Sequence, residues 1–142
     1  MAHFVLTDAY VEVNGVVLSD HARSVTVVDN RAQVEATGFG ATNNAYAKGL
    51  GDGSITIEFM QDFAAGEVHA TLQPLVGSTT PISVKVRATS SAISATNPSI
   101  ELNSALMFDY SPLAGNIGAL STFTATFQNA SSSGGITYDT TP

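Results

Sequence analysis

Histidines, carboxylates and serines are the residues of this sequence that could do chemistry, and their spacing forms no familiar site. His3, His21 and His69 are scattered, with no His-Glu-x-x-His spacing, so a zinc site would depend on the fold alone. No serine occupies a Gly-x-Ser-x-Gly turn with a histidine and an acid placed around it. We therefore expect no catalytic residue, no metal ligand and no cofactor, and we expect a protein that is not an enzyme.

The aspartates are similarly dispersed. Asp52 and Asp62 flank a predicted strand, and Asp8, Asp20 and Asp109 lie near predicted strand ends. Glycoside cleavage needs two carboxylates about 5 to 9.5 Å apart in a cleft, and sequence spacing does not establish that separation. Turn and helix-cap roles account for most of these residues.

The segment Gly49-Leu-Gly-Asp-Gly53 superficially resembles a phosphate-binding loop. It lacks the lysine of such a loop, it precedes a strand where a dinucleotide fold needs a helix, and Asp52 would repel phosphate. We reject a nucleotide site.

Composition limits the classes of partner. The chain has 142 residues, about one domain, with five Lys and Arg against twelve Asp and Glu, a net charge of −7 and no cysteine. Clamping DNA phosphates requires clustered cations, so composition argues against it. Thiol chemistry requires cysteine and is excluded. So few charges are unusual for a free monomer, which indicates that sister subunits cover much of the surface. No basic leader or membrane-length apolar run is present, so we expect no membrane partner and a cytosol-like compartment before assembly.

Alternation with a period of two dominates the chain and predicts strands. Asn14-Gly15 between Tyr10–Val13 and Val16–Leu18 predicts a tight hairpin. The remaining predicted strands lie around residues 24–28, 32–37, 54–59, 82–87, 100–108 and 122–128. In the run 32–37, Ala32, Val34 and Ala36 share the side expected to face inward, and the run as a whole is expected to be an exposed or partner-covered strand. Seven or eight strands predict a mainly β, antiparallel sandwich or barrel.

One segment has helical spacing. Asp62 could cap a helix over residues 63–76, in which Val68, Leu72 and Leu75 form one apolar stripe and Pro74 shortens or bends the last turn. This single helix should flank the sheet.

Two stretches are predicted to be irregular. Residues 38–53 contain five of the twelve glycines, together with Phe39, Tyr46 and Leu50, and are expected to form a long loop that docks onto something. Residues 131–142 begin with Ser-Ser-Ser-Gly-Gly and are expected to form a flexible C-terminal arm.

Together these features resemble the major tail tube proteins of long-tailed, siphovirus-like bacteriophages that infect actinobacteria. The resemblance runs from about residue 24 to residue 140 and rests on turn and strand signatures. These are Gly38-Phe-Gly-Ala-Thr42, Lys48-Gly-Leu-Gly-Asp-Gly-Ser-Ile55, Phe59-Met-Gln-Asp-Phe-Ala-Ala-Gly-Glu-Val68 with Leu72, and Ala95-Thr-Asn-Pro98.

The resemblance implies a structural virion protein, assembled in the host cytoplasm and residing in the virion tail as a single domain over residues 1–142. In this family, six copies form a ring, inner sheets join into a barrel, and stacked rings conduct DNA; other tail proteins are the further partners. It also implies that the loop at 38–53 reaches an adjacent ring, with Phe39, Tyr46 and Leu50 as anchors in apolar pockets of another copy. Alternatively, these three side chains fold back onto their own core.

The sequence leaves open which sheet face lines the lumen. A Thr-rich polar face is the hypothesis, with Glu35 and Glu58 as candidate lumen-facing acids that repel DNA. The alternative class is a small sandwich acting as a binding module, such as a capsid decoration protein or a carbohydrate-binding domain, or a minor tail or terminator protein.

Overall fold

The computed structural model describes residue 3 and residues 5–142. Its elements are β1 (Tyr10–Val13), β2 (Val16–Val17), a short 3-10 turn (Ser19–His21), β3 (Ala22–Glu35), β4 (Tyr46–Met60), α1 (Val68–Val76), β5 (Ile82–Arg87), β6 (Ser99–Met107), β7 (Thr122–Asn129) and β8 (Ile136–Asp139). The hairpin predicted at Asn14-Gly15 is confirmed, because both residues have the positive φ angles, 51° and 82°, that such a turn requires.

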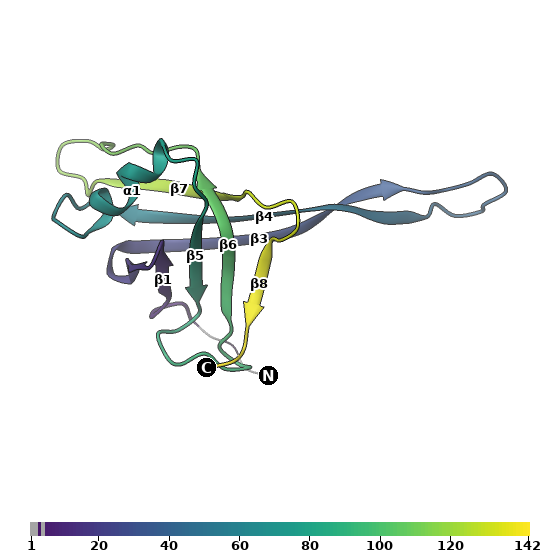
Figure 1. Ribbon diagram of the computed structural model, residues 1–142, viewed down its shortest axis with the longest axis horizontal. Helices are drawn as coiled ribbons and strands as arrows, with labels where there is room; N and C mark the ends of the chain where they lie inside the picture. The colour runs from purple at the N-terminus through teal and green to yellow at the C-terminus, as the bar shows by residue number, and fades with distance from the viewer. Residues whose placement is uncertain (1–2, 4) are drawn as a thin grey trace.

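The strands form one antiparallel sheet in the order β2-β1-β5-β6-β7-β4-β3, with β8 paired to β6. Figure 1 shows β1, β5, β6 and β8 running nearly perpendicular to β3, β4 and β7, so the sheet turns over at the β6–β7 junction into two layers. The predicted class, a mainly β antiparallel sandwich or barrel with one flanking helix, is confirmed.

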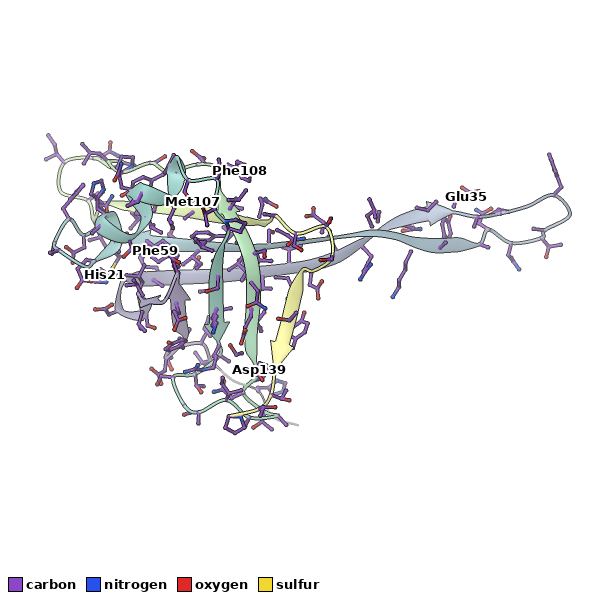
Figure 2. The ribbon with its side chains drawn as sticks, viewed as in Figure 1. His21, Glu35, Phe59, Met107, Phe108 and Asp139 are labelled. Carbon is purple, nitrogen blue, oxygen red and sulfur yellow. The ribbon has the colours of Figure 1, made fainter. Side chains whose placement is uncertain are left out.

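The core lies between these layers and follows the predicted alternation. Ile55, Ile57 and Phe59 of β4 are fully buried, opposite inward-facing residues of β7 such as Phe127. Phe59 lies inside the body in Figure 2. Burying each such side chain contributes about 1.5 to 3 kcal/mol, so this alternation fixes the register of the central strands.

The helix is shorter than predicted. It begins at Val68 and not at residue 63, and Glu67 precedes it without a side-chain cap. Gly66 has a φ of 78°, which interrupts helical geometry, and the carboxylate of Asp62 accepts the backbone N–H of Ala64 at 2.8 Å, capping a turn instead of the helix. The predicted apolar stripe is confirmed, since Val68, Leu72 and Leu75 are the buried residues of α1.

The predicted loop at 38–53 is also shorter. Residues 46–53 belong to β4 and pair with β3, which continues unbroken from Ala22 to Glu35, so only residues 36–45 connect the strands. Because Gly49, Gly51 and Gly53 take part in this pairing or its bulge, the glycine-rich run is a strand and not a phosphate loop.

The C-terminal segment is less free than predicted. Ile136–Asp139 is extended as expected, but it pairs with residues 99–102 of β6 as β8. The preceding turn is closed by the side-chain amide of Asn129, which donates to the carbonyls of Ser131 and Gly134 at 2.9 and 2.8 Å. Its extended part is therefore a paired strand of the body.

Candidate assembly surfaces

The far half of the β3–β4 hairpin, residues 29–53, extends beyond the body, and we call it the arm (Figure 1). β7 pairs with β4 only from Ser54 to Met60, so in the described chain the arm has two strands and no third. An isolated two-stranded ribbon is at best marginally stable in water. The arm is therefore a segment whose stability depends on what it contacts.

A β-bulge sets the two faces of the arm. Arg31 pairs with Gly51 and Gln33 pairs with Lys48, so Gly49 and Leu50 together oppose Ala32. A Cβ at Gly49 would lie 3.1 Å from both the Ala32 Cβ and the Val34 Cγ2, which places these residues on one side of the ribbon.

This side is the apolar face of the arm, and it continues the outward-facing side of the sheet. Its members by register are Ala32, Val34, Ala47 and Leu50. The predicted alternation and the expected exposure of this run are confirmed, but the expectation that Ala32 and Val34 face inward is wrong. In β3 the apolar positions change parity after Val27, so the later ones leave the core side; Val28 and Val34 are 41% and 49% exposed.

All three predicted anchors lie on the arm and touch no core. Leu50 is 87% exposed, Tyr46 is 54% exposed and Phe39, at the tip, is fully exposed. The alternative that they fold back onto their own core is therefore wrong for this chain by itself. They do not form one surface, because Tyr46 pairs with Glu35 on the face opposite Leu50. Val34 is a further exposed apolar residue of the arm. The sequence carries a signal for it, because the apolar positions of β3 change from one face to the other at Val28.

The base of the arm is held by the C-terminal strand. The Tyr138 hydroxyl donates to the Asp29 carboxylate at 2.8 Å, and this hydrogen bond raises the pKa of Tyr138. Gly53 lies against Ile136, and together with Arg31 and the turn at 131–135 they line a hollow of about 520 Å³. The base of the arm is thus in contact with β8.

The outward face of β4 and β7 is polar and rich in threonine. Thr56 and Glu58 alternate with buried residues of β4, and Thr124 and Thr126 do the same on β7, directly opposite them. The hydroxyls of Thr56 and Thr126 lie 3.4 Å apart. Neither strand places a lysine or arginine on this face, so the face offers no cation to phosphate.

The two candidate lumen acids are not neighbours. Glu58 lies in the body on this threonine-rich face, whereas Glu35 lies on the arm (Figure 2). By register, Glu35 faces the side of the ribbon opposite to Glu58, because it shares the face of the inward-pointing residues of β3. The strands of the arm also cross in the view of Figure 1, so the ribbon twists.

Three strands of the described chain have an unpaired edge, and one of them, β2, is only two residues long. In the part of the chain that the structure describes, β3 pairs only with β4 and β8 pairs only with β6. Such edges expose rows of backbone N–H and C=O groups, which are templates for pairing with another chain.

His21 is the centre of an acidic cluster between the 3-10 turn and the segment before α1. Its Nε2 lies 2.9 Å from Asp62, and its Nδ1 lies 2.9 Å from Asp20 and 3.4 Å from Glu67. Burial of the ring lowers the pKa of His21, but the hydrogen bonds to Asp62 and Asp20 and the surrounding negative charge outweigh it and raise the pKa overall. The backbone N–H of Ala64 and then His21 lower the pKa of Asp62.

The side chains of this cluster are of the types that ligate metal ions as well as of the types that form ion pairs. Ligand atoms of Asp20, His21 and Glu67 lie within 4.8 Å of one another. Sequence spacing missed the group because Asp62 and Glu67 are more than forty residues from His21. Its contacts are accounted for by ion pairing, which joins the start of β3 to the segment before α1.

No helix within residues 3 and 5–142 combines the length and apolar character needed to cross a bilayer.

No family model and no curated protein matches the sequence. Solved structures do match the fold. A chain from the virion of a native gene transfer agent particle superimposes with a TM-score of 0.69 at 10% identity, covering 92% of this chain and 95% of that one. A chain from the tail of an empty gene transfer agent particle with C6 symmetry gives 0.60 at 12% identity, covering 83% and 81%.

A chain from the six-fold symmetrised baseplate of the anti-feeding prophage gives a TM-score of 0.52 at 14% identity, covering 99% of this chain and 98% of that one. At such identities the likeness concerns the fold, and function has to be argued from the surfaces. This chain shares its fold, over nearly its whole length, with chains of phage-like tail and baseplate particles.

Proposed function

We propose that this protein is a structural subunit of a phage-like tail, whose copies form rings that stack into a tube conducting DNA. The observation that carries the proposal is the arm, an extended ribbon with exposed apolar side chains that nothing in the described chain covers. Residues Phe39, Tyr46 and Leu50 are the anchors, and each contributes about 1.5 to 3 kcal/mol when another copy buries it.

Ring closure uses the open sheet edges. The unpaired edges of β3 and β8 lie on different strands, so one copy's edge meets a different edge of its neighbour, which is the head-to-tail geometry that generates rings. Joining sheets around a closed barrel removes every edge. Six copies per ring is the stoichiometry that we propose, supported by the six-fold symmetry of two of the similar particles.

The threonine-rich face of β4 and β7 is the face that we assign to the lumen. Hydroxyls hydrate the wall, Glu58 repels phosphate, and the lack of outward cations on these strands prevents DNA from adhering. Glu35 lies on the opposite face of the arm, so its position supports a place in the lumen less directly than the position of Glu58 does.

Negative-stain microscopy of the purified protein at high concentration tests the proposal. Rings or filaments about 100 Å across are expected for six compact domains around a pore. A double variant, Phe39→Asp with Leu50→Asp, should lose stacking, while the exposed control Ser91→Asp keeps it. A monodisperse monomer under all conditions would refute the tube and favour a capsid-decorating binding module.

A further inference from the structure

His21 joins the start of β3 to residues 61–67, the segment between β4 and α1, at the end of the body away from the arm (Figure 2). Its Nε2 lies 2.9 Å from Asp62 and its Nδ1 lies 3.4 Å from Glu67, while Asp20, its neighbour in the chain, lies 2.9 Å from Nδ1. In the part of the chain that the structure describes, every side-chain hydrogen bond and ion pair between the 3-10 turn and this segment is made by His21. The ring of His21 is therefore the polar connection between the two.

Both ring nitrogens of His21 face carboxylates, and only a protonated ring satisfies both. An ionised carboxylate accepts hydrogen bonds and donates none, and a neutral imidazole carries a single N–H. When Nε2 keeps its hydrogen for Asp62, the lone pair of a neutral Nδ1 points at the oxygens of Asp20 and Glu67. The side chain of His21 is only 15% exposed, so water does not readily replace these partners. The arrangement fits an imidazolium ion and disfavours the neutral ring.

The proton of His21 is the positive charge among these acids. Three acids face the ring, from the 3-10 turn and from the segment before α1: Asp20, Asp62 and Glu67. Among the described residues no lysine or arginine forms an ion pair with them, Arg23 of β3 included. Glu58 of β4 points outward on the threonine-rich face, and His69 of α1 is directed to the hydroxyl of Tyr110, 2.8 Å from its Nδ1. Loss of the proton from His21 therefore leaves only repulsion at Nδ1.

Other contacts hold the segment on the side away from β3. The side chain of Gln61 donates to the Pro112 carbonyl at 2.6 Å, and the backbone N–H of His69 donates to the carbonyl of Asp62 at 2.9 Å. None of these contacts involves β3. Loss of the imidazolium contacts thus frees the segment from the start of β3 while it stays attached to α1 and to the loop at 108–121.

We infer that His21 is a pH-sensitive latch: its protonated ring holds residues 61–67 against the start of β3, and loss of the ring proton releases them. The latch acts beside an unpaired strand edge, because β3 pairs only with β4 in the described chain. The inference goes beyond the proposed function and concerns one chain by itself, so it holds whether or not copies assemble.

The direction of the switch follows from the surroundings of the ring. Burial lowers the pKa of His21, but the hydrogen bonds to Asp62 and Asp20 and the negative charge of Asp20 and Glu67 outweigh it and raise the pKa overall. The latch is therefore fully closed below the pKa of an unconstrained histidine, about 6.5, and opens as the pH rises through the raised pKa.

Hydrogen–deuterium exchange of the full chain tests the latch, at low concentration and with EDTA present so that no divalent cation replaces the proton. The reporter is the stretch 61–69, in which the backbone N–H groups of Ala64, Glu67 and His69 are hydrogen-bonded. The reference is β5, which is paired on both sides, with β1 and with β6. Protection factors, which divide out the intrinsic pH dependence of exchange, are compared from about pH 6 to about pH 9.

Raising the pH should lower the protection of the reporter about tenfold, the scale of one hydrogen bond to a charged group, and leave β5 unchanged. His21→Gln should give low reporter protection at every pH. His21→Arg keeps a positive charge opposite the acids and should give high protection at every pH. The matched control is His69→Gln, which removes the other histidine of this region and should keep the pH-dependent step.

Three results would overturn the inference. The first is reporter protection in the wild-type chain that does not change with pH, and the second is an equal loss in the reporter and in β5, which would make the effect global. The third is loss of the step in His69→Gln. The wild-type chain alone decides the first two, so the test does not depend on the folding of any variant.

Discussion

Replacing Gly53 with alanine puts a methyl group where the C-terminal strand packs against the base of the arm. A Cβ at this position would lie 2.9 Å from the Ile136 Cγ1 and 3.4 Å from the Ile136 backbone nitrogen. The first contact is closer than real Cβ atoms tolerate, and the second involves backbone, so the start of β8 has to move. Overpacking of this kind costs about 1 to 3 kcal/mol.

A smaller gain opposes this cost, since alanine in a strand is favoured over glycine by about 0.5 to 1 kcal/mol. The net loss is about 1 kcal/mol, which lowers the Tm by about 3 °C for a chain of this size. Thermal unfolding should be followed at low concentration, because association raises the apparent Tm. The matched control is Gly51→Ala, whose Cβ would meet only the flexible Arg31 side chain at 3.2 Å and should leave the Tm unchanged or slightly higher.

A double-mutant cycle isolates the contact. In an Ile136→Ala background the obstructing Cγ1 is gone, so Gly53→Ala should become neutral or stabilising, with a coupling energy of about 1 to 2 kcal/mol. An equal effect of Gly53→Ala in both backgrounds would refute the reasoning that Ile136 seats β8 against the arm.

Three further outcomes are expected. The pKa of His21 is raised, so its ion pairs stabilise the fold fully below its unfolded pKa of about 6.5, and this stabilisation is lost as the pH rises through the folded pKa. The pKa of Asp62 is lowered, so its interactions stabilise the fold above its unfolded pKa of about 3.9, and this stabilisation is lost as the pH falls through the folded pKa. The Tm of His21→Gln should therefore differ most from wild type between these limits, and a pH-independent difference would contradict the ion-pair role. Leu72→Ala, which removes a fully buried side chain of α1, should destabilise by about 2 to 5 kcal/mol in denaturant unfolding, whereas the exposed Gln73→Ala should change stability by less than about 0.5 kcal/mol; similar losses for both would contradict the packing of α1 on the sheet. Tubes of Glu58→Lys should retain DNA in about 50 mM salt and release it near 200 mM, and Glu58→Gln should retain none; identical behaviour of the two variants would remove Glu58 from the lumen.

Local sequence patterns predicted most of the body. The alternation in residues 54–59 and 122–128 placed the core faces of β4 and β7, and Asn14-Gly15 fixed a hairpin. The three buried positions of α1 followed from their helical spacing, although the helix starts at Val68 because Gly66 breaks the chain's helical geometry.

Sequence patterns predicted the structure less well where strands are held together by backbone hydrogen bonds alone. Glycines at 49, 51 and 53 favoured a loop, yet β3 pairs with this run because ladder hydrogen bonds need no side chain. The same holds for Ile136–Asp139, whose partner strand lies more than thirty residues away in sequence. The candidate anchors lie in the glycine-rich segment by sequence, but their exposure depends on the projection of the arm, and the division of Tyr46 and Leu50 between two ribbon faces depends on the bulge opposite Ala32.

The sequence by itself determined the strands of the core and the first hairpin, which faces of those strands are apolar, and that too few charges are present for a protein whose whole surface meets water. Those properties depend on side chains a few residues apart. Only the tertiary structure decided that the arm projects from one end, that the loops at 61–67 and 108–121 meet through Gln61 and Pro112, and that His21 meets Asp62. These arrangements arise from the pairing and packing of segments far apart in the chain, and local periodicity carries no information about which distant segments will meet.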